Sequence, residues 1–410
     1  MSVDSAQTQH APFAGTAAAI ASARRAAVAD RFALDSFTAE WRELSELEAI
    51  ADDWRELAAR ALAPNVFYEP AFALAAAPLF GRGVGAVLVW SGTSPRRLLG
   101  FFPARIEKRR YGIKLPVLVG WTHPFAPLGV PLVEPEAAEP VIAAWLAHLA
   151  GHADFPGVLL LPFVPEDGPF GAALEPILQR ARMPAAAFNR HRRALLAPQP
   201  DERTHYIERA LSARRLSRLR RRGRQLGELG ALMFTKSTES DAVDAALDDF
   251  FMVEASGWKG AAGTAALADP AVYDFVRTAL QVLAREGKVA INRILIDGAA
   301  IAAAITLRSG DAAWFWKIAY DERFARYSPG VLVALAVTEN LLDDAELASA
   351  DSCAPAEHPM IDHIWRERLP LCDLIVALRP QAPFRLARRL EGLRNAAIAG
   401  AKQLRDKLRR

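Results

Sequence analysis

The stretch "AAWFWKIAYDERFARYSPGVLVALAVTENLL" (Ala312–Leu342) passes from an aromatic run through a polar loop into a second apolar run. The aromatic run predicts a β-strand and the second run predicts a helix. At their junction, Ser328 is a candidate helix cap, Pro329 suits the first helical turn and Gly330 permits close approach to the backbone. A strand that opens directly into a helix points free N–H groups and the positive end of the helix dipole at one place, which is a geometry that binds phosphate.

Two arginines add positive charge to the same loop. Arg323 and Arg326 supply charge-assisted hydrogen-bond donors that favour an anion at the start of the helix. An ordinary capped helix with solvated arginines would contain the same residues. The loop alone therefore leaves both interpretations open.

The composition is that of a soluble globular protein. At 410 residues the chain exceeds what one hydrophobic core usually serves, so we expect two domains. No apolar run reaches the length of a membrane-spanning helix, and the N-terminus lacks the positive start of a secretory signal, which favours a cytoplasmic protein. Cys353 and Cys372 are too few for a disulfide framework or a cysteine zinc site, and we expect no metal.

The positive charge is local. The net charge is +3, but residues 381–410 carry +7 and the rest of the chain −4. Arginines outnumber lysines by 42 to 8, which indicates a compositional bias. An arginine cluster is therefore weaker evidence of function here than an individual lysine.

The chain divides into two parts with the same order of elements. Residues 1–35 are Ala-rich without an apolar period and predict a disordered leader. The first part has helix-like stretches at 39–62, 138–150 and 170–181 and strand-like stretches at 85–91, 97–110, 115–121 and 157–164. The second part has helix-like stretches at 241–254, 272–285, 331–342 and 359–369 and strand-like stretches at 288–296, 299–309, 312–320 and 346–353.

This parallel predicts an α/β protein with mixed sheets, built from two similar units in tandem. Asp297 and Gly298 favour a tight hairpin between two of the strands of the second unit. We expect an N-terminal domain at 36–198, a C-terminal domain at 199–380 and a basic helix at 381–410.

Residues 208–230 connect the two units and predict a helix with a strongly positive face. An apolar stripe of leucines leaves the arginines on the remaining surface. These are Arg214, Arg215, Arg218, Arg220, Arg221, Arg222 and Arg224. The helix is either a solvated connection or a contact for a phosphorylated, acidic or nucleic-acid ligand.

Three stretches together resemble one family. They are "GWKG" (257–260), "KIAYDERFARYSPGVLVALAVTENLL" (317–342) and "ADSCAPAEHPMIDHIWRER" (350–368). They are similar to the GNAT acetyltransferase domain of CelD-like proteins, which are associated with cellulose and envelope polysaccharide synthesis. The Fem-type peptidyltransferases, which are tandem GNAT-like repeats, are their relatives. The resemblance extends over roughly residues 37–379 and implies two tandem GNAT-like domains, the N-terminal one degenerate.

The resemblance implies that the quoted loop holds the pyrophosphate of an acyl-CoA and so forms a phosphate cradle. The matching residues are Arg323, Arg326, Tyr327, Ser328, Pro329, Gly330 and Val331. The loop has a single glycine where the superfamily usually has Gly-x-Gly or Gly-x-Ala. Acetyl-CoA is the expected donor, and an aminoacyl-tRNA, as in Fem-type proteins, is the alternative.

Acyl transfer to an amine requires removal of an amine proton and often an acid for the leaving thiolate. Tyr320, at the end of the strand beside the cradle, is the candidate acid, or a packed aromatic. Asp351, after the next strand, is a candidate base or orienting group, or a cap or ion-pair partner. His358 is a candidate base, and His363, on the same predicted short helix, a candidate acceptor contact.

Two lysines stand next to tryptophans in a chain that otherwise uses arginine. Trp258 with Lys259, and Trp316 with Lys317, are candidate substrate-binding residues, or amphipathic packing. In the N-terminal unit the loop at 121–133 has no arginine and predicts a wall of the acceptor cleft instead of a CoA site. The candidate wall residues of this cleft are Phe67, Tyr68, Trp121 and His123.

The sequence thus predicts an N-acyltransferase that moves an acetyl group from acetyl-CoA to an amine, with an amino sugar or envelope precursor as the acceptor class. A Fem-like aminoacyl-tRNA-dependent transferase and a non-catalytic scaffold of polysaccharide synthesis or export are the alternatives. Only the Fem-like alternative involves nucleic acid.

Residues 384–410 predict a basic amphipathic helix. Its apolar stripe is narrow and consists of Leu386, Leu390, Leu393, Ala397, Ala401, Leu404 and Leu408. Such a helix packs on the body or a partner, or it makes a weak contact with an anionic membrane surface.

Overall fold

The computed structural model describes residues 37–92, 94–257, 263–379 and 382–408. The predicted leader at 1–35 and the candidate substrate-binding residues Trp258 and Lys259 lie outside the described residues.

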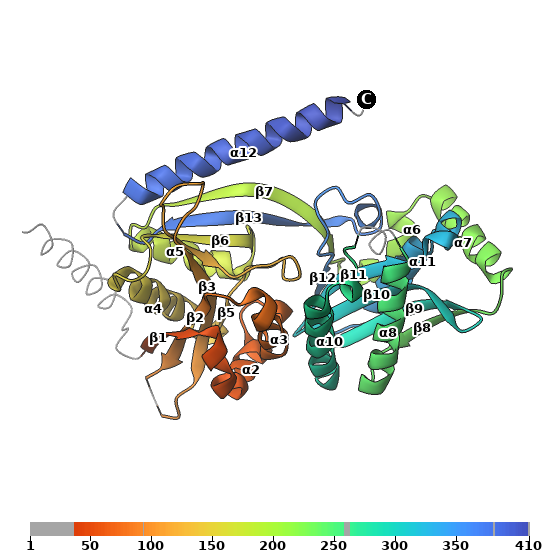
Figure 1. Ribbon diagram of the computed structural model, residues 1–410, viewed down its shortest axis with the longest axis horizontal. Coiled ribbons are helices and arrows are strands. Elements are labelled where there is room, and N and C mark those ends of the chain that lie inside the picture. The colour runs from red at the N-terminus through yellow and green to blue at the C-terminus, as the bar shows by residue number, and fades with distance from the viewer. Residues whose placement is uncertain (1–36, 93, 258–262, 380–381, 409–410) are drawn as a thin grey trace, which may run out of the picture.

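The described residues form one 13-stranded mixed sheet that runs through the molecule (Figure 1). Its strand order is β1-β2-β3-β4-β6-β13-β7-β12-β11-β10-β9-β8, and β5 pairs with β3 outside this path. The strands are β1 (Phe37–Glu43), β2 (Val84–Ser91), β3 (Leu98–Glu107), β4 (Val117–Gly120), β5 (Leu132–Val133), β6 (Val158–Pro165), β7 (Ala185–Leu196), β8 (Leu232–Ser237), β9 (Val289–Ile296), β10 (Ala299–Ser309), β11 (Ala312–Tyr320), β12 (Ser349–Asp351) and β13 (Glu367–Ala377).

Each half of the sheet has the same pairing pattern. In the N-terminal half β1 to β4 are antiparallel neighbours, and β4 pairs with β6 in parallel. In the C-terminal half β8 to β11 are antiparallel neighbours, and β11 pairs with β12 in parallel. This repetition confirms the predicted mixed α/β fold with two similar units in tandem.

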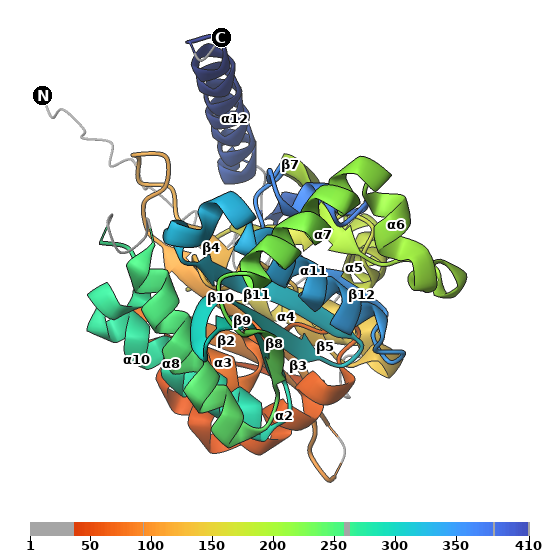
Figure 2. The ribbon, with the colours of Figure 1, turned by 90° about the vertical axis from the view of Figure 1, so that its right-hand side faces the viewer.

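Helices cover both faces of the C-terminal half of the sheet. The α-helices of the described residues are α2 (Ala51–Arg60), α3 (Pro70–Phe80), α4 (Ala138–Gly151), α5 (Pro169–Arg180), α6 (Tyr206–Ala210), α7 (Ala213–Gly227), α8 (Ser240–Ser256), α10 (Pro270–Arg285), α11 (Pro329–Leu342) and α12 (Ala382–Leu408). Alternate residues of β10 point to opposite faces. Ala303 and Ile305 join the core that includes α8 and α10, whereas Ala302 and Ala304 join the core that includes α7 and α11. Figure 2 shows α8 and α10 on one side of this part of the sheet and α7 and α11 on the other.

Two predicted helices are different in the structure. The stretch 39–62 begins as part of β1, which pairs with β2 as far as Glu43, and becomes an α-helix only at Ala51. The stretch 359–369 contains a short 3₁₀ turn at Ile361–His363, and Glu367 already starts β13. In both places pairing with a distant strand overrides the local helical period.

The connecting segment 208–230 is helical, but it is divided. Ser212 separates α6 from α7, and its hydroxyl caps α7 by accepting a hydrogen bond from the Arg215 N–H at 3.3 Å. Strands β7 and β13 do not appear among the predicted strands. They lie next to each other in the middle of the sheet.

These two strands are exchanged between the halves. β7 follows the N-terminal half in sequence but pairs with β12, and β13 follows the C-terminal half but lies between β6 and β7. Asp373, at the irregularity of β13, accepts hydrogen bonds from the Phe163 N–H at 3.1 Å and from the Asn189 amide at 2.5 Å. One carboxylate thus ties β13 to both of its neighbours.

A buried ion pair fixes the junction between β7 and β12. Arg193 on β7 donates to the Asp351 carboxylate of β12 at 2.5 Å and to the Pro127 carbonyl at 3.0 Å. The two side chains are only 2% and 7% exposed. Because neither charge can reach water, each depends on the other.

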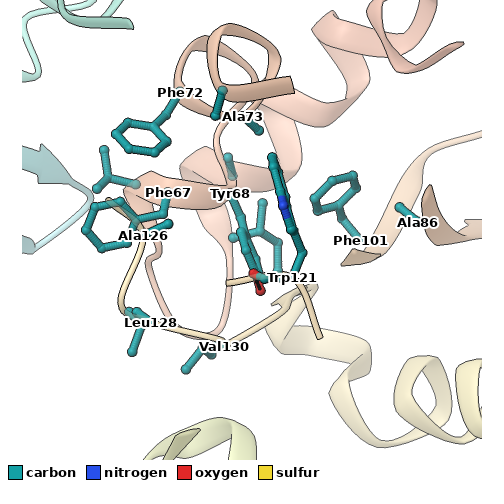
Figure 3. Close-up of a cluster of buried hydrophobic side chains, with 14 of the residues drawn as sticks. Phe67, Tyr68, Phe72, Ala73, Ala86, Phe101, Trp121, Ala126, Leu128 and Val130 are labelled. Atoms are coloured by element: carbon teal, nitrogen blue, oxygen red, sulfur yellow. Dashed lines mark hydrogen bonds between the residues drawn. The ribbon is translucent and has the colours of Figure 1, made fainter. Parts of the chain in front are cut away.

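The aromatic residues that were expected to line an acceptor cleft belong to the core. Phe67, Tyr68 and Trp121 are at most 1% exposed, and the Tyr68 hydroxyl donates to the Trp121 carbonyl at 2.5 Å (Figure 3). His123 stacks on Phe80 at 4.2 Å between ring centroids. Both of its ring nitrogens are buried without a partner among the described residues, and burial lowers its pKa to about 3. Phe67, Tyr68 and Trp121 therefore stabilise the interior of the molecule, which corrects their predicted role, while His123 is half-buried beside them.

We expect Arg193→Met to lower the free energy of unfolding by about 3 to 5 kcal/mol, because it leaves the Asp351 charge buried without a partner. Urea unfolding followed by tryptophan fluorescence measures the change. The exposed neighbour Arg192 is the control, since Arg192→Met removes the same charge at the surface. Equal losses for the two variants would contradict the role of the buried pair.

Candidate functional site

The main cavity of the C-terminal half opens where two parallel strands part. The pairing of β11 with β12 covers only Ala312–Trp314 and Ser349–Asp351. Beyond it, a cavity of about 710 Å³ lies between residues 315–320 of β11 and the loop at 352–361. The β10–β11 register skips Trp316, so a bulge bends β11 at the same place. The cavity is therefore a consequence of the sheet topology.

The cavity brings together many of the predicted site residues. It is lined by Trp316, Lys317 and Tyr320 of β11, by Ser328, Gly330 and Val331 at the start of α11, and by Cys353 and His358 of the loop after β12. Glu254 and Gly257, at the C-terminal end of α8, complete the wall. Candidate acid, base, cradle and substrate residues thus share one space.

The start of α11 has an unusual backbone. Ser328 adopts a left-handed conformation, with φ 57° and ψ 50°, between the 3₁₀ turn Glu322–Tyr327 and α11. Its hydroxyl accepts a hydrogen bond from Arg222 of α7 at 2.5 Å and makes no cap. A guanidinium from another helix therefore lies at the N-terminus of α11.

The ring of Tyr320 lies too close to residue 330 for a side chain there, so this position needs glycine. A Cβ atom at this position would lie 2.9 Å from Cδ1 of Tyr320. The ring of Tyr320, which is 37% exposed, thus lies against the first turn of α11. The predicted acid and the predicted cradle are in direct contact.

The arginines of the loop point elsewhere. Arg323, 82% exposed, binds the Asp321 carboxylate through Nε and Nη2, and this hydrogen bonding lowers the pKa of Asp321. The guanidinium of Arg326 lies 4.7 Å from the ring centroid of Tyr327, which is itself buried. Pro329 is buried in the first turn of α11. Among the described residues, Arg222 is therefore the arginine bonded to the cradle.

Arg222 belongs to a ridge of arginines on α7. Arg214, Arg218 and Arg221 are exposed and lie within roughly 100° of Arg222 around the helix. The sequence places Arg222 in this positive face, but no local signal links it to Ser328, 106 positions later. The contact follows from the packing of α7 against the turn at 322–327.

The N-terminal half contributes Phe125, which sequence reasoning did not single out and which contacts two residues of the cavity wall. The Trp316 indole donates to the Phe125 carbonyl at 2.8 Å. The Lys317 ammonium lies 4.1 Å from the Phe125 ring centroid and 5.3 Å from that of Trp316. The loop that contains Phe125 thus positions both candidate substrate-binding residues.

Asp351 is not directed into the cavity. One carboxylate oxygen binds Arg193 and the other accepts the Cys353 N–H at 2.9 Å. Burial raises the pKa of the Cys353 thiol well above its usual range. The structure therefore places Asp351 as a support for the loop that borders the cavity.

His358 lines the cavity as a neutral ring. Its Nδ1 accepts the N–H groups of Met360 and Ile361 at 3.3 and 3.4 Å, and burial lowers its pKa against the opposing effect of Asp362. The neutral ring therefore carries its proton on Nε2. His363 is exposed and is absent from the cavity wall. Among the described residues, no group of His, Cys, Asp and Glu side chains has the arrangement of a metal site.

Glu254 is a buried carboxylate on the cavity wall that the sequence analysis did not single out. It is 5% exposed, and its Oε2 accepts the Ala266 N–H at 2.9 Å. A signal was present, because Glu254 follows Leu247, Phe250 and Phe251 on the apolar face of α8 at helical spacing. A charged residue on such a face is costly to bury and is therefore a functional candidate.

We expect Arg222→Gln to weaken CoA binding about tenfold, because it removes a charge-assisted donor at the start of α11. Calorimetric titration with CoA measures the dissociation constant. Arg224→Gln is the matched control, since Arg224 lies on the same helix but is turned away from Ser328. An unchanged affinity in a folded Arg222→Gln protein would exclude the arginine from the cradle.

We expect Tyr320→Phe to lower kcat more than it raises the KM of the donor, which is the pattern of a lost transition-state interaction. The ring is kept, so its contact with Gly330 is preserved. Steady-state kinetics with the donor varied separates the two parameters. A change in KM alone would make Tyr320 a binding residue.

Comparisons with known proteins agree with this geometry. Residues 213–358 match the family model described as "Acetyltransferase (GNAT) domain", and this range contains α7 and all the cavity residues except Pro359, Met360 and Ile361. No curated protein matches the sequence. A crystal structure of FemX is similar over 82% of this chain and 98% of its own, with 9% identity and a TM-score of 0.52.

Other solved structures resemble the chain less well in TM-score. The C-terminal domain of a putative lysylphosphatidylglycerol synthetase from Agrobacterium fabrum covers 73% of this chain and 85% of its own, with 15% identity and a TM-score of 0.45. A tandem GNAT protein of the clavulanic acid pathway covers 84% and 99%, with 14% identity and a TM-score of 0.39.

The chain thus shares the fold of FemX, and its residues 213–358 are similar to the acetyltransferase domain of the GNAT type.

Proposed function

We propose that the protein is an N-acyltransferase that moves an acetyl group from acetyl-CoA to an amine. One observation carries the proposal. The opening between β11 and β12 leads directly to the N-terminus of α11, where Ser328 and Arg222 are hydrogen bonded. An elongated donor with a phosphate-rich end and a reactive acyl end fits this combination of strand opening and positive helix terminus.

The donor is assigned to the C-terminal half. In the N-terminal half, the equivalent region beside β4 and β6 is filled by the chain itself, since the Gly129 N–H donates to the Phe163 carbonyl at 3.3 Å. A Cβ atom on Gly129 would lie 2.0 Å from the Pro162 carbonyl oxygen. This close packing leaves the cavity of the C-terminal half as the donor site.

The reaction needs an acid and a base around one carbonyl. The amine nitrogen attacks the thioester carbon, so that a C–N bond forms, the C–S bond breaks and the amine loses a proton. Glu254 accepts this proton, and Tyr320 protonates the leaving thiolate. Both side chains line the same cavity. His358 lines it too, but its Nδ1 already accepts backbone N–H groups and its Nε2 carries a proton, so the neutral ring is a hydrogen-bond donor to the cavity instead of the predicted base.

We assign the acceptor side to the region where Phe125 meets Trp316 and Lys317. This region has aromatic faces, an ammonium group and, across the cavity, the Glu254 carboxylate. An amino sugar or another envelope precursor offers a polar amine beside an apolar ring face. This acceptor class is the one that the resemblance to CelD-like proteins implies. Trp258, Lys259 and His363 stay predicted contacts of this acceptor.

A Fem-like transferase that uses aminoacyl-tRNA is the second candidate. The arginine ridge of α7 favours it, because Arg214, Arg218 and Arg221 continue away from the cradle along the helix. Such a ridge fits a long polyanion better than a single pyrophosphate. The two candidates share the cradle and differ in the length of the anion that they require.

Thermal unfolding with acetyl-CoA, CoA or tRNA separates these functions. A ligand present at about a hundred times its dissociation constant stabilises the native state by about 2.7 kcal/mol, which raises Tm by several degrees. We expect a rise with both CoA species and none with tRNA. A rise in Tm with tRNA alone would support the second candidate. An unchanged Tm with all three ligands would contradict both candidates and indicate a scaffold.

A further inference from the structure

The C-terminal helix α12 docks on the body through a face that differs from its predicted apolar stripe. Phe384, Ala387 and Glu391 are at most 3% exposed and pack near β6, β7 and β13. Glu391 accepts hydrogen bonds from Arg110 Nη2 at 3.0 Å and from the Tyr111 hydroxyl at 2.8 Å. A polar anchor therefore holds the first turns of the helix.

Two of the predicted stripe's leucines, Leu386 and Leu393, are left in solvent. Leu386 is 42% exposed and Leu393 is 68% exposed, while Leu390 is only partly covered by the body. At 100° per residue, Leu386 and Leu393 are turned by roughly 140° from the docked face. The apolar surface that the spacing predicts for packing is thus free for a partner.

The C-terminal part of α12 stands away from the body. Figure 1 shows its first turns above β7 and β13 and its other end clear of both, and Figure 2 shows the helix projecting from the molecule. From Ala396 to Ile398 the residues are exposed, including Ile398 at 42%. The 27 residues of α12 span about 40 Å, so a long part of the helix is accessible.

The charge on this helix selects the kind of partner. Arg385, Arg388, Arg389 and Arg394 are exposed on α12; Arg389 and Arg394 lie nearest to the leucines, and Arg394 is also 3.4 Å from the Glu391 carboxylate. Five further basic residues follow in sequence, and the acidic residues of the segment are Glu391, which is bound to the body, and Asp406. A second α12 of the same charge would be repelled, whereas an anionic surface would be attracted.

We propose that α12 binds an anionic membrane surface, with Leu386 and Leu393 at the boundary between headgroups and acyl chains and the arginines on the lipid phosphates. Clusters of four to eight basic residues on an amphipathic helix bind such surfaces electrostatically. The exposed leucines add a small apolar contribution. No helix within the described residues is long and apolar enough to cross a membrane, so the contact is peripheral. The proposal is independent of the acyltransferase site.

Co-sedimentation of the full chain with vesicles tests the proposal. We expect binding to phosphatidylglycerol–phosphatidylcholine vesicles, little binding to phosphatidylcholine alone, and release when NaCl rises from about 50 mM to about 500 mM, since screening shortens the reach of the charges. The variant Leu386→Glu/Leu393→Glu should lose at least about tenfold in partitioning, because it places two acids on the lipid-facing line. Neutralising Arg385, Arg388 and Arg389 to Gln should give a loss of similar size.

The control carries the same charge change at another exposed apolar place. Leu229→Glu/Met233→Glu alters residues that are 44% and 48% exposed on the C-terminal half, and it should bind like the parent chain. Circular dichroism shows that each variant is folded. Binding that is unaffected by the α12 variants, or that ignores lipid charge, would overturn the proposal. So would absence of vesicle binding together with a dimer, seen by light scattering, that the leucine variant dissociates.

Discussion

The exchange of β7 and β13 is the constraint on which the rest of the structure depends. β13 comes from the C-terminal half but pairs with β6, and β7 comes from the N-terminal half but pairs with β12. Because β7 and β13 also pair with each other, one hydrogen-bonded sheet runs through both halves. The buried pair of Arg193 and Asp351 closes this arrangement beside β12. Asp351 also holds the Cys353 N–H and so begins the loop that departs from β11. The cavity edge is therefore set by the same contacts that join the two halves.

Much of the fold was predictable from the sequence because most helices and strands have their own hydrophobic periodicity and are bounded by turn or cap residues. The hairpin at Asp297–Gly298, the two tandem series of strands and helices and the strand–loop–helix at 312–342 are all local patterns. What the sequence did not show is long-range. β7 and β13 are strands because they pair with each other across 172 or more positions, as Leu195 pairs with Glu367. The same pairing converts the predicted helix at 359–369 into a turn followed by a strand.

The site follows the same division. The strand-to-helix junction at Ser328 and Gly330 was predictable from its local pattern, and the resemblance assigned Tyr320, Lys317 and His358 to one site. The structure places these three residues in one cavity wall, and their roles stay predictions. Arg222 and Phe125 were not, since both arrive from other parts of the chain through packing. Chemical type alone also failed to distinguish a carboxylate facing the cavity from one buried in an ion pair, as Glu254 and Asp351 illustrate.

The contact between Tyr320 and Gly330 couples the proposed donor cradle to the proposed acid. The phenol ring rests on the turn that would receive the phosphates, so any shift of that turn reorients the hydroxyl. In an enzyme arranged in this way, binding energy from the nucleotide end of the donor is expressed at the thioester end. Shortened donors that keep the thioester but lack the nucleotide would then react slowly even at saturation. The same geometry would limit hydrolysis of a donor that is bound without an acceptor.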